Sequence, residues 1–177
     1  MVNNLNYIDM KKLGIAILLF IISCIVPVNM AVKSIRFNQE CAGYLKQSAD
    51  ANTTELALQR LNKALDYIES HNLTSGYTSI LWRTEDENIG FWYENIKACK
   101  RELENCAEGT QLEKSNVLMK VRESLTDDGG EDGVKLTIPP GISRYPENRQ
   151  YAFWLTLSLI LMAGSVIWGY KIIEDMD

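Results

Sequence analysis

Two long stretches without a charged side chain, residues 13–32 and 151–170, constrain this chain more than any other feature. Each has about the twenty apolar residues that a helix needs to cross a bilayer core roughly 30 Å thick. If both stretches cross, the two tails lie on one side of the membrane and residues 33–150 lie on the other. The pattern therefore predicts a two-span membrane protein with a single water-facing domain.

The second stretch has the edges that are typical of a membrane helix. Aromatic side chains, which favour the membrane–water interface, mark both of its ends: Tyr151, Trp154, Trp168 and Tyr170. Within it, Ser165 and Gly169 form a small-xxx-small pair, at which another helix can approach closely. We therefore expect a membrane-spanning helix that packs against a neighbour through these two residues.

The first stretch allows a second interpretation. Lys11 and Lys12, followed by the apolar residues 13–26, have the charge and the apolar core of a signal peptide. Residues 29–31, however, read Asn-Met-Ala and lack the small-x-small pattern at which such peptides are cleaved. An uncleaved anchor is the favoured interpretation, and a cleaved signal peptide is the alternative.

Positive charges near the spans are almost balanced between the two sides. The tails contribute Lys11, Lys12 and Lys171, and the middle segment contributes Lys33, Arg36, Arg144 and Arg149. The excess of cytoplasmic lysine and arginine that orients many membrane proteins is therefore weak here. The pair that directly precedes the first span favours tails inside and an extracytoplasmic middle segment.

The charge of the middle segment excludes one class of partner. Residues 33–150 contain 15 Lys/Arg and 19 Asp/Glu, with the two signs interspersed. Binding of nucleic acid needs a concentrated basic face that neutralises phosphates. We therefore expect no nucleic-acid partner.

Apolar residues with helical spacing run through most of the middle segment and predict an all-α bundle. The first span is expected to continue as a helix to about residue 51. Leu58, Leu61, Leu65 and Ile68 predict the next helix over residues 55–70, with residues 52–54 as its cap. Two more helices are predicted from apolar stripes: one opens at Thr84 and carries its stripe from Ile89 to Cys106, and the next opens at Thr110 and carries its stripe from Leu112 to Leu125.

Two sequence patterns predict where helices begin. Thr84-Glu85-Asp86-Glu87 and Thr110-Gln111-Leu112-Glu113 both have the threonine and the glutamate three residues later that form a capping box. Residues 127–133 are rich in glycine and acids and predict a flexible turn, because the acid ladder of a calcium loop is missing. Residues 134–138 are expected to be extended, and the prolines that follow predict a stiff lead into the second span.

The cysteines leave two interpretations open. Cys99 and Cys106 lie about two helical turns, or roughly 10 Å, apart and cannot bond to each other within a helix. Cys41 could form a disulfide with either in an oxidising compartment, or all three could be buried thiols. Cys24 is interpreted as a small apolar residue of the first span.

The sequence offers no catalytic or cofactor-binding motif. It contains one histidine, His71, and none of the standard nucleophile, zinc or phosphate-loop patterns. We therefore expect a non-enzymatic protein without metal or cofactor.

Aromatic residues are the most suggestive cluster. Phe91, Trp92 and Tyr93 are consecutive, so they cannot all face one core, and Trp82 lies nearby. We interpret these four residues as anchors for a protein partner, since large aromatics dominate binding surfaces. The alternative is that they only fill the core of a small domain.

Several segments resemble parts of uncharacterised bacterial two-span membrane proteins. These are residues 41–53 (CAGYLKQSADANT), 72–79 (NLTSGYTS), 90–95 (GFWYEN) and 113–119 (EKSNVLM). The resemblance brings no known activity. It implies a bacterial envelope, so the expected location is the inner membrane.

The sequence thus predicts five segments: a tail (1–12), a span (13–32), a helical water-facing domain (33–150), a second span (151–170) and a short acidic tail (171–177). We expect a membrane-anchored interaction or scaffold protein whose domain contacts lipid at its anchors and binds a protein partner or a second copy. The alternatives are a ligand-sensing module that signals laterally through a partner, and an accessory subunit of a larger membrane complex.

Overall fold

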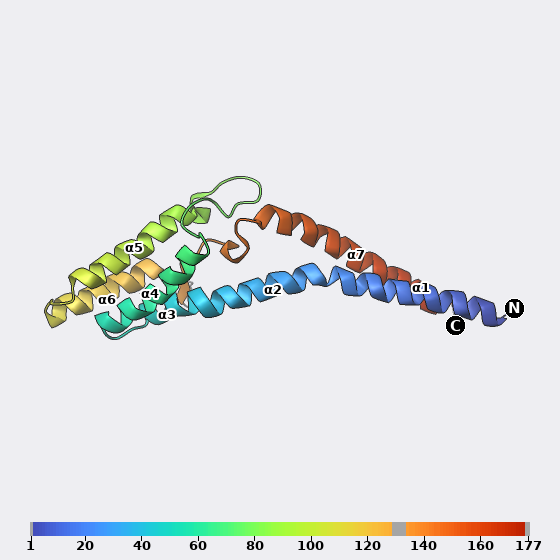
Figure 1. The fold of residues 1–177 in the computed structure, drawn as a ribbon, viewed down its shortest axis with the longest axis horizontal. Coiled ribbons are helices and arrows are strands. Elements are labelled where there is room, and N and C mark those ends of the chain that lie inside the picture. Colours follow the sequence, from blue (N-terminus) through green and yellow to red (C-terminus); the bar gives the residue numbers. More distant parts are fainter. Residues whose placement is uncertain (1, 129–133, 176–177) are drawn as a thin grey trace. The chain divides into compact units, whose positions relative to one another are not determined.

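The computed structural model describes residues 2–128 and 134–175, which are mostly helical, as the all-α prediction requires (Figure 1). The chain divides into two compact units. One, here called the apolar unit, combines residues up to 32 with residues from 149 onward. The other, the middle unit, is Lys33–Asn148.

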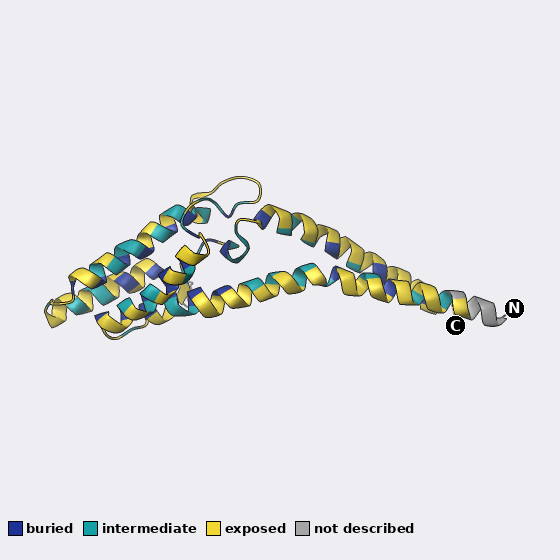
Figure 2. Cartoon of the chain, viewed as in Figure 1, coloured by how far each residue is buried: buried dark blue, intermediate teal, exposed yellow. Residues whose placement is uncertain are grey.

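The apolar unit contains helix α1 (Val2–Ser23), the first part of α2 (Ile25–Phe37) and α7 (Asn148–Glu174). A turn at Cys24 separates α1 from α2. Two helical stretches are long and apolar enough to cross a membrane, with mean hydropathy of 2.6 and 1.8 in their most apolar windows. Only 11% of each window is buried, and most positions of α7, and of α1 where burial is described, are exposed (Figure 2).

The middle unit is built from helices with one small hairpin. Its helical elements are the π-helical turn η1 (Asn38–Ala42), α3 (Gly43–Ala49), α4 (Thr54–Ser70), the 3₁₀ turn η2 (Glu85–Glu87), α5 (Ile89–Asn105), α6 (Gln111–Leu125) and the 3₁₀ turn η4 (Ile142–Arg144). Strands β1 (Thr126–Asp128) and β2 (Val134–Leu136) pair antiparallel, with Thr126 opposite Leu136. The predicted acidic turn falls largely on residues 129–133, which lie outside the described residues.

Helix α4 is the centre of the core of the middle unit. It packs against α3, α5, α6 and η1 (Figure 1). Its apolar side chains at three- and four-residue spacing form the buried face, and Leu61 and Ile68 are both completely buried. Ala57 and Ala64 are also completely buried, and their small side chains let the neighbouring helices approach closely. The predicted amphipathic helix over residues 55–70 is therefore confirmed.

The end of α3 is held by polar contacts from two other helices. The hydroxyl of Ser48, which is buried, donates a hydrogen bond of 2.9 Å to the carbonyl oxygen of Ala57 on α4. On the other side, Arg122 of α6 donates through Nε to the carbonyl oxygen of Ala49 and pairs with Asp50. A cation at this position satisfies a free carbonyl and complements the helix dipole.

Of the two predicted capping boxes, one is confirmed and the other is wrong. Thr110 and Glu113 make both reciprocal hydrogen bonds at the start of α6. Thr84 does not cap a helix: its hydroxyl donates to Glu87 at 2.7 Å within the turn η2. Helix α5 instead begins at Ile89 because Asn88, a strong capping residue, accepts a hydrogen bond of 3.1 Å from the backbone N–H of Phe91.

This assignment predicts unequal effects of two substitutions. Replacing Asn88 by alanine should lower the free energy of unfolding by about 1 kcal/mol, the usual cost of losing a helix cap. Replacing Thr84 by alanine should have a clearly smaller effect, since it removes only an exposed contact inside a turn. Denaturant unfolding of the full chain in detergent, followed by near-ultraviolet circular dichroism, measures both. An equal or larger effect of Thr84→Ala would contradict the assigned cap.

Candidate functional site

The most site-like feature of the middle unit is a groove of about 570 Å³ beside the first half of α5. One side is formed by η2 and the first two turns of α5, and the other by the end of α6, the β-hairpin and the segment 137–140. We call it the α5 groove. All the residues that line it belong to the middle unit.

The floor of the α5 groove is part of the hydrophobic core. Trp92, Ile96 and Leu125 line it, and their exposed fractions are only 6%, 1% and 4%. Because these side chains are packed from behind by the rest of the core, the floor is fixed before any ligand binds. Its wall across from α5 is largely apolar and extended, with Leu136, Ile138 and two prolines.

Phe91 lies at the edge of the groove and is 65% exposed. It directly precedes the buried Trp92, and consecutive residues of a helix point about 100° apart. The ring of Phe91 therefore lies at the surface, and the ring of Trp92 lies in the floor of the groove. A large exposed ring beside a buried one is the arrangement that binding surfaces favour.

The rim of the groove carries more negative than positive charge. Glu85 and Asp86 lie on the side of η2, while Asp127 and Lys135 lie on the hairpin. Asn88 and Asn95 add amide groups along α5, and Asn88 is held in place by its hydrogen bonds to Phe91 and Tyr77. This combination of an apolar floor and a polar, acidic rim suits an apolar segment that carries a positive charge.

The arrangement contains no assembled catalytic group. His71 lies outside the groove, where its ring stacks on Tyr67 at 3.9 Å and its Nδ1 lies 2.9 Å from the Tyr67 carbonyl oxygen. Within residues 2–128 and 134–175, no three His, Cys, Asp or Glu side chains are grouped to hold a metal ion.

The structure separates the four aromatic residues that were predicted as partner anchors. Phe91 and Trp92 both line the α5 groove. Tyr93 points elsewhere: its hydroxyl donates to Glu69 of α4 at 2.8 Å, a contact that raises its pKa. Trp82 lies in the loop before η2 and is 76% exposed. Two of the four residues thus share the groove, one lies on an exposed loop, and one makes a contact between helices.

Sequence reasoning missed one wall of the groove completely. The sequence predicts an extended segment at 134–138 and a stiff lead into the second span at the prolines that follow, and it assigns none of these residues to a site. The periodicity of α5 placed Ile96 in the core, but no local pattern shows which distant segment packs beside it. A run of Leu-Thr-Ile-Pro-Pro without helical spacing is the one signal that this segment lies against another surface.

The small-residue pair predicted in the second span faces α1 within the apolar unit. Apart from Ala152, the buried or half-buried residues of α7 recur at alternating three- and four-residue spacing: Asn148, Tyr151, Leu155, Ser158, Met162, Ser165, Gly169 and Ile172. This is the spacing of a coiled-coil seam. A Cβ atom added to Gly169 would lie 3.8 Å from the Cβ of Ala16, which is an ordinary van der Waals contact, so Gly169 lies directly beside α1 and an alanine would also fit there.

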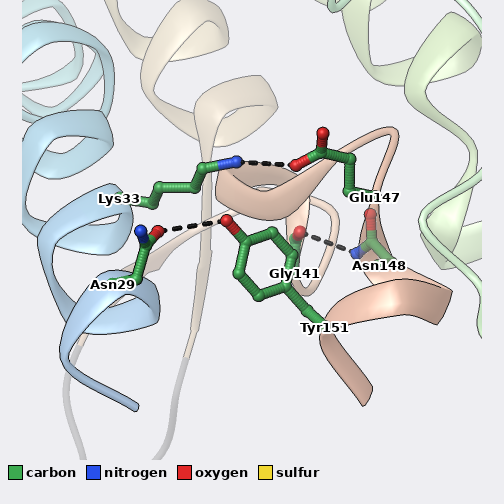
Figure 3. Close-up of polar contacts among 6 residues, drawn as sticks. All are labelled: Asn29, Lys33, Gly141, Glu147, Asn148 and Tyr151. Carbon is green, nitrogen blue, oxygen red and sulfur yellow. Dashed lines mark hydrogen bonds and ion pairs between the residues drawn. The ribbon is translucent and has the colours of Figure 1, made fainter. Parts of the chain in front are cut away.

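Nearer the start of α7, Tyr151 donates a hydrogen bond of 3.0 Å to the side chain of Asn29 in α2 (Figure 3). Residue 16 therefore lies near 169 and residue 29 near 151, which is an antiparallel arrangement. In this structure Ser165 and Gly169 therefore face another helix of the same chain.

The cysteines of the middle unit are free thiols in this structure. Cys41 is completely buried in η1, and Cys99 and Cys106 are buried along α5 and at its end. Burial disfavours the charged thiolate and raises the pKa of the Cys41 thiol to about 12, and it also raises the pKa of Cys99. Such thiols are structural groups of the core and are unreactive.

No protein-family model, curated protein or solved structure matches this chain. The resemblance to bacterial two-span proteins therefore stays a prediction, and function has to be inferred from the groove and the apolar helices themselves.

The pKa of Cys41 predicts how slowly this thiol reacts. Compared with an ordinary exposed thiol, a pKa of about 12 lowers the thiolate fraction at pH 8 roughly a thousandfold, and burial blocks access as well. Maleimide labelling of the full chain at pH 8, quantified by peptide mass spectrometry, should therefore leave Cys41 unmodified while a denatured sample is labelled quickly. Equal rates in both samples would contradict the buried thiol, and labelling of the denatured chain only after reduction would reveal a disulfide.

Proposed function

We propose that this protein is a non-enzymatic, membrane-anchored interaction protein whose middle unit binds a segment of another protein in the α5 groove. The observation that carries the proposal is the groove itself, with its buried aromatic floor and exposed Phe91. The two long apolar helices support the membrane anchor.

The groove favours an apolar segment as its occupant. Binding energy at protein surfaces concentrates where an aromatic side chain meets a pocket that excludes water. Trp92 and Ile96 provide a floor that does not need to rearrange, so little ordering cost opposes binding. Phe91, already exposed, gains most from being covered.

The rim favours a segment that carries a lysine or an arginine. The described residues around the groove include three carboxylates, those of Glu85, Asp86 and Asp127, and one ammonium group, that of Lys135. A cation on the partner therefore meets a complementary potential, and an acidic segment meets repulsion. The charges thus give selectivity, while the apolar floor gives most of the affinity.

The two apolar helices would hold the middle unit at a membrane. Their few buried positions leave apolar surface that water does not favour and lipid does. With the tails inside, the middle unit is extracytoplasmic, and the resemblance to bacterial proteins points to the inner membrane. A role as accessory subunit of a larger membrane complex is the same proposal with a membrane protein as the partner.

A second candidate is a ligand-sensing module, which the size of the groove favours. A volume of about 570 Å³ is in the range of small-molecule pockets, roughly 300–1,000 Å³. In that case the middle unit would pass its signal to a partner through the membrane helices. The two candidates differ in whether Phe91 contacts a protein.

Site-specific crosslinking at Phe91 tests the proposal. A photoreactive benzoyl-phenylalanine replaces Phe91 in one sample and Leu112, equally exposed on α6 but outside the groove, in a matched control. After illumination of native membranes, position 91 should give a discrete adduct of higher mass that position 112 does not give. Asp86→Lys in the same background should weaken the adduct, because it removes negative charge from the rim.

The possible outcomes separate the candidates. An adduct of twice the mass of the chain would identify a second copy as the partner. The absence of any protein adduct at position 91 would contradict the proposal and favour the small-molecule candidate. Equal adducts at positions 91 and 112 would show that contact is unrelated to the groove.

A further inference from the structure

The long loop that joins α4 to α5 is drawn in Figure 1. It carries a cluster of large apolar side chains that are exposed. At its tip, Ile80, Leu81 and Trp82 are consecutive, with exposed fractions of 45%, 74% and 76%. We call residues 77–84 the apolar loop. Exposure of three adjacent apolar side chains to water is unfavourable, so we expect another surface to cover them.

The stem of the apolar loop is held by specific hydrogen bonds. The N–H of Thr78 donates to the carbonyl oxygen of Glu87 at 3.1 Å, and the side chain of Asn88 donates to the hydroxyl of Tyr77 at 3.2 Å. Thr78 itself is only 2% exposed. The tip is therefore presented on an ordered base, as an anchoring loop requires.

The stem lies at the end of the middle unit where the chain continues into α7. The N–H of Ile89 donates to the carbonyl oxygen of Gly76, and a Cβ at Gly76 would collide with the ring of Tyr145. Glycine, here at φ 103°, is thus required for this close approach. Tyr145 is three residues before Asn148, the first residue of α7.

The other chain connection reaches this same end of the middle unit. Lys33, its first residue, pairs with Glu147 at 3.0 Å (Figure 3). The side chain of Asn148 donates to the carbonyl oxygen of Gly141, which holds the last turn before α7 (Figure 3). Both connections to the apolar helices and the stem of the apolar loop are therefore gathered at one end of this unit.

We propose that the tip of the apolar loop inserts into the interfacial layer of the same membrane that holds the two apolar helices. The inference rests on the proposed membrane anchor. Trp favours the level of the headgroups, where its apolar ring and polar N–H are both satisfied, and Leu81 and Ile80 extend toward the acyl chains. The loop is then a third, peripheral contact between the middle unit and the bilayer.

The charges next to the tip indicate which lipid it needs. Arg83 follows Trp82, but its guanidinium lies over the ring of Tyr77 at 5.0 Å, and Glu85, Asp86 and Glu87 come directly after it. An acidic run beside the tip opposes attraction to anionic lipid. Insertion is therefore driven by the apolar side chains and does not require anionic headgroups.

Quenching of Trp82 by brominated lipid tests the inference. The full chain and its Trp82→Phe variant are reconstituted in phosphatidylcholine vesicles with and without bromine on the acyl chains, and the difference between them isolates the Trp82 emission. We expect this emission to lose about half of its intensity or more in brominated lipid, since an interfacial tryptophan lies close to the acyl chains. Adding anionic lipid should not increase the loss.

Two further variants serve as controls. Trp168→Phe isolates a tryptophan of the second apolar stretch, which reports the membrane anchor independently of the loop. Leu112→Trp in the Trp82→Phe background places an exposed tryptophan on α6, where we expect no quenching. Quenching of Trp168 without quenching of Trp82 would overturn the inference and leave the anchor intact. If neither is quenched, the anchor and the inference both fail.

Discussion

Burial of one face of α4 is the interaction on which the rest of the middle unit depends. Leu61, Leu65 and Ile68 are buried against α3, α5, α6 and η1, and the alanines between them let those helices come close. Each such leucine or isoleucine contributes about 1.5–3 kcal/mol by leaving water, far more than the exposed ion pairs of this unit. Removing this face would leave the surrounding helices without a common surface.

The same core positions the two features that carry function. The edge of the core at the start of α5 is the floor of the α5 groove. Asn88, the residue that caps α5, connects this groove to the apolar loop. Asn88 caps the helix, lines the groove and donates to Tyr77 in the stem of the apolar loop. A ligand in the groove and a membrane at the loop therefore act on neighbouring parts of one ordered framework. Phe91 and Trp82, the two most exposed of the predicted anchors, serve these different surfaces.

Local patterns predict the helices of this fold well, because amphipathic spacing and capping residues are properties of short stretches of sequence. The face of α4, the capping box at Thr110 and the two apolar helices all follow from such patterns. The start of α5 was misplaced because two capping residues, Thr84 and Asn88, compete within five positions, and the geometry of the intervening turn decides between them. The groove could not be predicted, since its second wall comes from residues more than thirty positions away from Phe91, and no local rule pairs them.

We expect the middle unit to be one cooperative body built on α4, with the groove floor as part of it. Hydrogen exchange of the full chain in lipid nanodiscs, resolved by mass spectrometry, measures this directly. The amides of α4 around Leu61 and Leu65 should exchange together with those of Trp92 and Ile96, at the slowest rate in the middle unit, because all need global unfolding to open. Exchange of α4 as fast as the turn at residues 71–76, with α5 still protected, would contradict the account.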